Sequence, residues 1–255
     1  MRASLGGRPG SVNLNAMTRV DRWLENLGGL FLPPRCLLCG AQGTAGRDLC
    51  TGCAADLIRN GPCCPRCALP LAAPAPLCGE CLDRGPAFAV ACVPFVYAAP
   101  LDVLVTRCKF QRDLAAARVL AGLFRAQAAR SVELPQALVP VPLHPQRLRE
   151  RGYNQALEIA RPLARRLGIP LCPDLLHRVR ATEAQTHLDA PARRRNLRDA
   201  FAAGPAPLPG HIALFDDVMT TGATLAECAR VLRAAGVARV DVWAVARVAR
   251  GGAGP

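Results

Sequence analysis

Short apolar runs alternate with helical patterns from about residue 88 onward. The apolar runs predict buried strands over residues 90–97, 137–141, 211–215 and 239–246. Around and between them, apolar residues recur at helical spacing over residues 100–109, 113–130, 153–167 and 223–236. Strands that alternate with helices predict an α/β fold, in which a parallel sheet carries helices on both faces. Ligands of such sheets bind at the carboxyl ends of the strands.

The segment before this alternation has few long apolar runs and carries a regular pattern of cysteines. Four C-x2-C pairs, each separated from the next by ten residues, comprise Cys36 and Cys39, Cys50 and Cys53, Cys64 and Cys67, and Cys78 and Cys81. A C-x2-C turn places two thiolates on one knuckle, and two knuckles close a tetrahedron around zinc. The eight cysteines therefore predict two Zn²⁺ sites. All-cysteine coordination leaves no open position for catalysis, so we expect the zinc to be structural and to supply folding energy.

The spacing leaves the connectivity of the two zinc sites open. Pairing the first knuckle with the second and the third with the fourth closes the shortest loops and is preferred, although a crossed arrangement fits the same spacing. Disulfides or a single redox pair are the less favoured interpretations, because no secretory signal is seen and four pairs repeat. Cys63 duplicates the position of Cys64 and is interpreted as a spare. The other cysteines are expected to be small buried residues: Cys92, Cys108, Cys172 and Cys228.

The chain before the cysteines contains a leader and a short helix. Residues 1–16 are predicted to be unstructured, with Met17 as an alternative start. Residues 23–31 place apolar side chains at helical spacing, and Pro33 ends this predicted helix. The chain then divides into a leader with a short helix, a double zinc ribbon and the α/β domain, over residues 1–30, 31–86 and 87–250. With neither a secretory signal nor eighteen consecutive apolar residues, we expect a cytoplasmic protein without a membrane span.

Composition and charge narrow the classes of partner. Of the 255 residues, 51% are hydrophobic and 20% are charged, which excludes a largely disordered chain. The net charge is +13, and Lys109 is the one lysine among 32 basic residues. Residues 146–198 hold 12 Arg and five acidic residues, a net charge of +7. This segment suits a flap over a phosphate-bearing ligand, a nucleic-acid backbone, or a solvated surface. Nearby aromatic residues are scarce, only Tyr153 and Phe201, which disfavours base recognition.

Residues 212–224 are the most informative stretch, because an apolar strand pattern ends there on two acids. Asp216 and Asp217 follow four apolar residues and are therefore predicted at the carboxyl end of the strand. Two adjacent carboxylates do not favour phosphate by charge. They suit hydrogen bonds to the vicinal hydroxyls of a sugar, as acids at a βα turn do in dinucleotide sites.

A turn of small residues follows the acids and opens the next predicted helix. It comprises Thr220, Thr221, Gly222, Ala223 and Thr224. Such a turn at a helix N-terminus presents backbone N–H groups and hydroxyls to an anion, and Gly222 allows close approach. The whole stretch predicts a cradle for a ribose 5-phosphate, with the phosphate on the turn and the ribose hydroxyls on the acids. An ordinary strand–turn–helix with capping acids is the structural alternative.

This stretch resembles the signature loop of type I phosphoribosyltransferases, which bind phosphoribosyl pyrophosphate (PRPP). Residues 139–155 and 178–201, with the cysteine pattern upstream, narrow the resemblance to the ComF/GntX family, a double zinc ribbon fused to a phosphoribosyltransferase-like domain. The resemblance runs from about Trp23 to about Arg247. It implies the type I phosphoribosyltransferase fold and PRPP with Mg²⁺ as the ligand. In some members it implies a link to natural transformation or single-stranded DNA, but it supplies no settled reaction.

Cleavage of PRPP develops positive charge on the ribose and negative charge on the pyrophosphate, so an enzyme needs cations and Mg²⁺ around the leaving group. Lys109 lies after the first predicted strand, near where this fold often contacts pyrophosphate, and Arg151 follows the second. With Asp216 and Asp217, they form the predicted catalytic set. Residues 154–155 begin the next helix and are candidate orienting groups.

Two functions are compatible with these features. The first is ribosyl transfer from PRPP·Mg²⁺ to an acceptor that the sequence does not identify, with release of pyrophosphate. The second is a competence or DNA-uptake accessory protein with protein partners, in which the ribbons and the Arg-rich segment bind single-stranded DNA and PRPP is regulatory or vestigial. The intact stretch at 216–224 favours the first function. No acceptor pocket is recognisable in the sequence, so the second function stays an alternative. The sequence does not indicate an oligomeric state.

Overall fold

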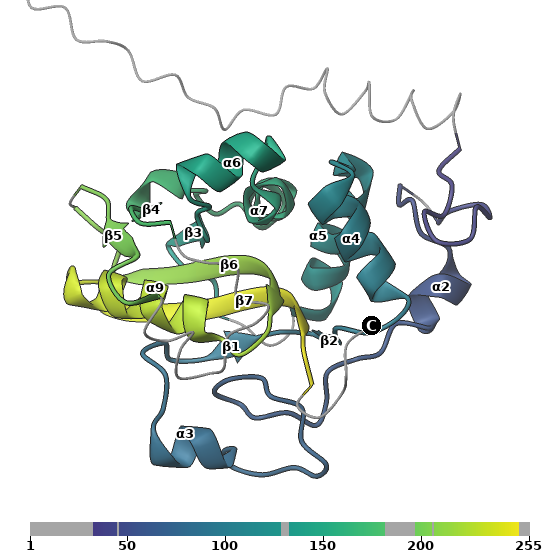
Figure 1. Ribbon diagram of the computed structural model, residues 1–255. Helices are drawn as coiled ribbons and strands as arrows, with labels where there is room; N and C mark the ends of the chain where they lie inside the picture. Colours follow the sequence, from purple (N-terminus) through teal and green to yellow (C-terminus); the bar gives the residue numbers. More distant parts are fainter. Residues whose placement is uncertain (1–32, 45, 129–132, 182–196, 206, 250–255) are drawn as a thin grey trace, which may run out of the picture.

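A parallel sheet of five strands forms the centre of the computed structural model, which describes residues 33–44, 46–128, 133–181, 197–205 and 207–249. The order is β1-β7-β6-β3, and β2 pairs with β7 in the same register as β1 (Figure 1). The strands are β1 (Ala91–Cys92), β2 (Phe95–Val96), β3 (Ala137–Pro140), β6 (His211–Met219) and β7 (Arg239–Arg247). All of these pairings are parallel, which confirms the predicted α/β sheet.

Helices cover both faces of this sheet (Figure 1). One face carries α4 (Leu101–Phe110), α5 (Leu114–Ala128) and α7 (Gln155–Leu167). The other face carries α9 (Ala223–Ala234). Successive strand residues point to opposite faces. Phe215 of β6 therefore packs in the first core, where its ring meets Phe124 edge-on at 5.7 Å, whereas Leu214 packs in the second core beside α9. Burial on both faces explains why the strands are continuous apolar runs in the sequence.

Two strands differ from their predicted extent. The predicted strand over residues 90–97 is split into β1 and β2, because Pro94 between them has no N–H to donate to the ladder. β6 runs on to Met219, since its pairing with β7 continues through Asp216, whose partner is Ala244. The two acids thus lie inside the strand rather than after it.

In the α/β domain, four short elements have no counterpart in the sequence prediction. They are α6 (Pro145–Arg151), the 3-10 turn η1 (Pro173–Leu175), β4 (Leu176–Arg178) and β5 (Phe201–Ala203). β4 and β5 form an antiparallel pair of three residues each, too short for a periodic signal. α6 contains no buried residue and so leaves no apolar pattern. It begins at Pro145, and the ring of His144 accepts a hydrogen bond from the N–H of Gln146 at 3.3 Å.

The two cysteine-rich segments, residues 36–53 (ribbon 1) and 64–81 (ribbon 2), dock on different faces of the sheet. Each is associated with one short helix, α2 (Thr51–Ala55) or α3 (Gly79–Asp83). Ribbon 1 packs on the α4 and α5 face, and Arg107 of α4 donates a hydrogen bond to the carbonyl of Leu37 at 2.7 Å. Ribbon 2 joins the core on the α9 face, so α2 and α3 lie far apart in Figure 1.

Several sequence predictions fall outside the described residues. They concern the leader over residues 1–16, the short helix over residues 23–31, and the part of the Arg-rich segment at residues 182–196. Across the described ranges, no helix combines the length and the apolar character needed to cross a membrane.

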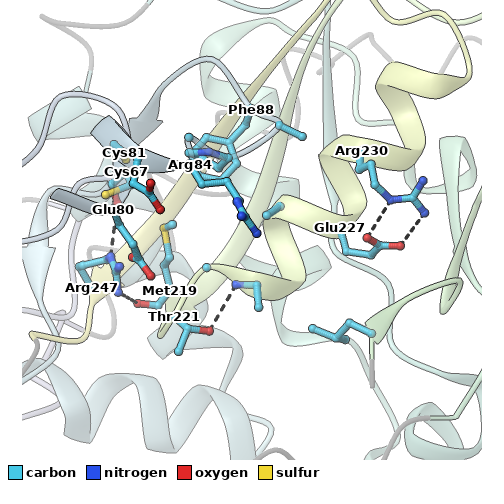
Figure 2. A pocket seen from close by; sticks show the side chains of 18 of the residues that line it. Cys67, Glu80, Cys81, Arg84, Phe88, Met219, Thr221, Glu227, Arg230 and Arg247 are labelled. Atoms are coloured by element: carbon cyan, nitrogen blue, oxygen red, sulfur yellow. Dashed lines mark hydrogen bonds and ion pairs between the residues drawn. The ribbon is translucent and has the colours of Figure 1, made fainter. Parts of the chain in front are cut away.

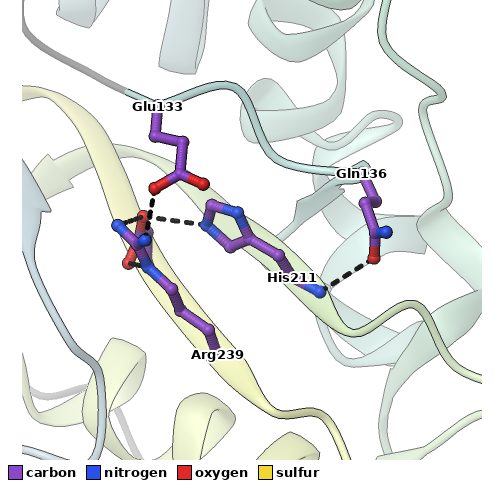
Figure 3. A network of polar contacts seen from close by, with 5 residues as sticks. Glu133, Gln136, His211 and Arg239 are labelled. Carbon is purple, nitrogen blue, oxygen red and sulfur yellow. Dashed lines mark hydrogen bonds and ion pairs between the residues drawn. The ribbon is translucent and has the colours of Figure 1, made fainter.

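A polar network ties the amino ends of β6 and β7 together (Figure 3). The carboxylate of Asp241 is buried, and its Oδ2 lies 2.9 Å from Nε2 of His211. The guanidinium of Arg239 donates two hydrogen bonds to Asp241, at 3.0 and 3.1 Å, and also contacts Glu133 at 2.5 Å. Gln136 accepts a hydrogen bond from the backbone N–H of His211 at 3.0 Å. This network fixes the end of the sheet opposite to the two acids of β6.

Candidate functional site

The eight predicted zinc ligands lie in two groups of four. The groups are Cys36, Cys39, Cys50 and Cys53, and Cys64, Cys67, Cys78 and Cys81. Within each group, the four sulfur atoms lie within 4.8 Å of one another. The Sγ atoms of Cys39 and Cys50 are 3.7 Å apart, and those of Cys67 and Cys78 are 3.6 Å apart. Zn–S bonds of about 2.3 Å give a tetrahedron with sulfur–sulfur edges of about 3.8 Å, so each group fits one Zn²⁺. The preferred pairing of adjacent knuckles is confirmed.

Backbone N–H groups favour the thiolate form of one cysteine in each group. Burial raises the pKa of Cys36, but N–H groups of its own knuckle and of Cys50 outweigh burial and lower the pKa to about 6. The same balance lowers the pKa of Cys64 to about 6, with the N–H of Cys78 at 3.4 Å from its sulfur. Since zinc binds thiolates, one ligand of each group is favoured in its metal-binding form near neutral pH.

The other five cysteines lie outside both groups. Cys63, the predicted spare, is one of them. Cys108 and Cys228 are buried as predicted, whereas Cys92 and Cys172 are only partly buried. Burial raises the pKa of all five thiols, which keeps them protonated and makes them poor metal ligands.

Asp216 and Asp217 leave β6 toward opposite faces of the sheet. Asp217 is buried on the α4 side, where its Oδ2 lies 3.8 Å from Nζ of Lys109. This oxygen has no hydrogen-bond partner within the described part of the chain. Asp216 is on the α9 side, and its Oδ1 accepts a hydrogen bond from the N–H of Asp217 at 2.9 Å. Burial and the charge of Asp217 raise the pKa of Asp216 well above its usual range.

The turn after the acids has the shape expected of an anion-binding loop. Gly222 has a φ of 80°, a left-handed conformation that favours glycine, and a Cβ there would also press on Cε of Met219 at 2.5 Å. The hydroxyl of Thr221 accepts a hydrogen bond from the N–H of Ala223 at 3.3 Å, at the start of α9. Thr220 and Thr221 are exposed. Hydroxyls and the first turn of a 12-residue helix are therefore accessible together.

Arg151, the last residue of α6, approaches the same region. Its Nη1 donates a hydrogen bond to Oε1 of Gln155 at 2.7 Å, and its guanidinium lies 5.6 Å from the ring centroid of Phe110. Burial and the charge of Arg147 lower its pKa, and the carboxylate of Asp217 counteracts them. The four predicted catalytic residues thus lie toward one end of the sheet, and Gln155, a candidate orienting group, accepts the hydrogen bond from Arg151.

Of the three residues between Arg151 and Gln155, the two with polar side chains, Tyr153 and Asn154, contribute differently. Asn154 caps α7 and donates a hydrogen bond to the carbonyl of Val141 at 2.9 Å, so it fixes the backbone. The hydroxyl of Tyr153 is buried and has no hydrogen-bond partner in the described ranges. Burial raises the pKa of Tyr153 to about 12. Tyr153 therefore places a buried polar group in this loop.

A cleft of about 620 Å³ opens between ribbon 2 and α9 (Figure 2). Its ribbon wall includes Glu80 of α3 and Arg84, and its opposite wall includes Thr221 and Arg230. Charges of both signs line it, and Arg230 is paired with Glu227 at 2.7 Å. Ribbon 2 thus forms one wall of a cleft whose other wall contains the candidate phosphate loop.

The guanidinium of Arg247 connects ribbon 2 to that loop (Figure 2). Arg247 ends β7 and is 3% exposed. Its Nε donates to the carbonyl of Cys67, a predicted zinc ligand, at 3.3 Å. Its Nη1 donates to the carbonyl of Met219 at 3.0 Å and also to those of Thr220 and Val248. One buried donor thus holds the zinc knuckle and the start of the loop in fixed relation, a role that no sequence pattern revealed.

We expect two Zn²⁺ per folded chain. Cys67→Ser removes one ligand of the second group, so ribbon 2 should lose its metal and become sensitive to protease. Elemental analysis and limited proteolysis measure both effects. Cys63→Ser is the matched control and should keep both ions. Fewer than one zinc per folded wild-type chain, or equal metal loss in both variants, would contradict the two-site assignment.

We expect Arg247→Met to lower the free energy of unfolding by about 3 kcal/mol, because it leaves buried carbonyls without their charged donor. Arg230→Met is the control from the same cleft. Its exposed pair with Glu227 should contribute at most about 1 kcal/mol. Urea titrations followed by circular dichroism compare the two variants, and equal losses would rule out a special role for Arg247.

Comparison with known proteins extends over nearly the whole chain. Residues 27–82 match the family model of the double zinc ribbon domain. The chain is 38% identical to competence protein F of Haemophilus influenzae over 226 residues, which are 85% of this chain and 98% of that protein. It is 39% identical to DNA utilization protein YhgH of Salmonella typhimurium over 173 residues, 66% of this chain and 76% of that protein. It is also 28% identical to competence protein ComFC of Streptococcus pneumoniae over 153 residues, 60% and 66% of the two chains.

The match to the double zinc ribbon domain agrees with the two cysteine groups described above. An identity of 38% that spans almost all of a relative reflects common descent rather than a shared motif. The chain therefore belongs to the ComF/GntX family.

Proposed function

We propose that this chain binds PRPP with Mg²⁺ at the carboxyl end of β6 and transfers its ribosyl group to an acceptor, releasing pyrophosphate. The main support for the proposal is the proximity of Lys109 and Asp217, whose Nζ and Oδ2 atoms lie 3.8 Å apart. The two residues are distant in the sequence: Lys109 belongs to α4, and Asp217 lies in β6 before the turn at the N-terminus of α9. A sugar phosphate with an anionic leaving group needs such a combination of carboxylate, ammonium and anion-binding turn.

Each part of PRPP has its own residues in this proposal. The 5-phosphate contacts residues 220–224 and the N-terminus of α9. The ribose hydroxyls donate hydrogen bonds to Asp216 and Asp217. Lys109 and Arg151 face the pyrophosphate, and the hydrogen bond from Arg151 to Gln155 fixes the direction of its guanidinium.

The donor set fits Mg²⁺. This ion prefers oxygen ligands, usually one or two carboxylates with water and substrate phosphates. Oδ2 of Asp217 is a buried carboxylate oxygen that accepts no hydrogen bond within the described ranges, so it is available to a cation. Asp217 would hold the ion through this oxygen. When bound, the ion would neutralise charge on the pyrophosphate.

Departure of the pyrophosphate breaks the bond between C1 of the ribose and the pyrophosphate oxygen. Positive charge then develops on the sugar and negative charge on the leaving group. The ammonium of Lys109 and the guanidinium of Arg151 stabilise the leaving group, because both are positioned before the charge develops. The acceptor supplies the electron pair that forms the new bond to C1.

Replacement of the acids tests the ribose assignment. Asp216→Asn and Asp217→Asn should each weaken PRPP·Mg²⁺ binding about tenfold or more, since a hydrogen bond to a charged group contributes about 1.5–3 kcal/mol. The folded-state pKa of Asp216 is raised, so its ionisation costs stability once the pH exceeds the unfolded-state pKa. Asp216→Asn should therefore raise the free energy of unfolding at pH 7. Calorimetry measures the affinity, and chemical denaturation measures the stability.

Asp102→Asn is the control for this experiment. Asp102 lies in the first turn of α4, at the other end of the helix from Lys109, and should leave the affinity unchanged. Unchanged PRPP affinity in the Asp216→Asn, Asp217→Asn double variant would reject the ribose role.

We also propose a role in DNA uptake or utilization, with single-stranded DNA as a second ligand. Relatives bear the names competence protein and DNA utilization protein. The specific observation is that α6 presents Arg147 and Arg149 to solvent in a chain of net charge +13. Such a surface suits a phosphate backbone.

Salt dependence measures this contribution. Each phosphate contact contributes about 0.7 to the slope of log affinity against log salt on single strands. Arg147→Gln with Arg149→Gln should therefore flatten the slope by about 1.4. Arg125→Gln with Arg165→Gln is the control, because these exposed residues lie in the last turns of α5 and α7. Anisotropy titrations in which both pairs change the slope equally would remove α6 from the interface.

A further inference from the structure

Phe110 is an exposed aromatic side chain beside the candidate site. It is the last residue of α4 and follows Lys109, which faces Asp217. Its side chain is 68% exposed, and every other Phe, Tyr or Trp in the described ranges is buried or half-buried. A large apolar surface left in water at the edge of a polar site indicates a contact with a ligand or partner.

The ring of Phe110 is held by its neighbours. The guanidinium of Arg151 lies 5.6 Å from the ring centroid, a cation–π contact. Arg151 is itself fixed by Gln155, and its carbonyl accepts a hydrogen bond from Arg112 at 3.1 Å. Arg151 lies over one face of the ring, and Phe110 nevertheless remains 68% exposed. Phe110 thus presents a flat apolar face in a fixed orientation.

The surroundings of this face are basic. Arg151 lies over the ring, Lys109 and Arg112 lie within two residues of Phe110 in the chain, and Arg147 lies close enough to act on the pKa of Arg151. The nearby acids have partners of their own: Asp217 is buried against Lys109, Asp113 pairs with Arg107, and Glu150 accepts a hydrogen bond from Gln146. A ligand for this surface therefore combines a flat apolar face with negative charge.

We propose that Phe110, framed by Arg151, is a stacking platform for a nucleobase whose phosphate contacts Lys109 and Arg112. The ligand class is a nucleobase that carries phosphate, either a free nucleotide or one unit of a single strand. Aromatic stacking is tolerant of sequence because every base has a π-face. The inference rests on the proposed function, because it assigns a ligand class to the edge of the same site. It also reverses the expectation that aromatic residues are too scarce there for base contacts.

Removal of the Phe110 ring should lower the affinity only for ligands that contain bases. The probes are a fluorescent twelve-nucleotide oligothymidylate and a strand of twelve abasic deoxyribose phosphates. Phe110→Ala should weaken oligothymidylate binding about five- to 150-fold, the range for one stacked base. It should leave the abasic strand unaffected, because the basic residues remain. Phe110→Trp should retain or strengthen binding, whereas Phe110→Leu, which keeps apolar area without a π-face, should resemble Phe110→Ala.

The control is Val103→Ala. Val103 is 46% exposed and lies two turns earlier on the same face of α4, so it reports a general effect of trimming this helix. It should bind both strands like the wild type. Equal loss of affinity for the two strands in Phe110→Ala, or full rescue by Phe110→Leu, would overturn the stacking assignment and indicate an apolar contact with another partner.

Thymidine monophosphate distinguishes whether the ligand is a free nucleotide or one unit of a single strand. If a free nucleotide is the ligand, it should quench the indole fluorescence of Phe110→Trp and displace oligothymidylate at concentrations near its own Kd. If a unit of a strand is the ligand, only the oligonucleotide should quench. Absence of quenching by both would overturn the proposal.

Calorimetry with PRPP·Mg²⁺ keeps this result distinct from the proposed function. PRPP binding by Phe110→Ala with loss of oligothymidylate binding would support both. Failure of the wild type to bind PRPP, with base-dependent binding through Phe110 intact, would reject the PRPP function and retain the stacking platform.

Discussion

The hydrogen bonds of one buried guanidinium determine how the zinc-binding part and the sheet fit together. A ribbon of about twenty residues has too little apolar surface for a core of its own, so metal and docking must hold it. Ribbon 2 docks where β7 ends, and Arg247 donates to carbonyls of the knuckle and of the loop after β6. Because these contacts are buried, movement of the knuckle also disturbs the loop. The zinc group is thus a structural support of the candidate site, although it is closed to catalysis.

The continuation of β6 imposes a second constraint. Since strand pairing runs through Asp216, the two acids must diverge to opposite faces. Asp217 meets the single lysine, while Asp216 has no comparable basic neighbour at this distance among the described ion pairs, and its pKa is raised. Two adjacent carboxylates at one strand end lower the stability of the folded state. Local cost of this kind is typical of sites shaped for a ligand.

The sequence predicted the repetitive parts of the structure well. Long apolar runs and helices of ten or more residues were found, because burial on one or two faces leaves a periodic pattern, and the cysteine spacing predicted both metal groups. The short elements α6, β4 and β5 were missed, since they bury little or span too few residues. Arg247 and Phe110 were missed for another reason. Their roles depend on which distant segments the fold brings beside them, and no local pattern encodes that.

Position in the fold also explains why the basic residues differ in what they do. Arg107, Arg239 and Arg247 donate to carbonyls or carboxylates of the framework, so part of the +13 charge is committed to structure. The guanidinium suits such sites because its planar fork reaches several acceptors at once. At Asp217 the geometry is different, since one buried oxygen faces one compact ammonium across 3.8 Å. That gap is wider than a hydrogen bond and leaves both charges partly unsatisfied. A chain that uses arginine almost everywhere therefore has its one lysine where a small charge can face a carboxylate and still bind an anion.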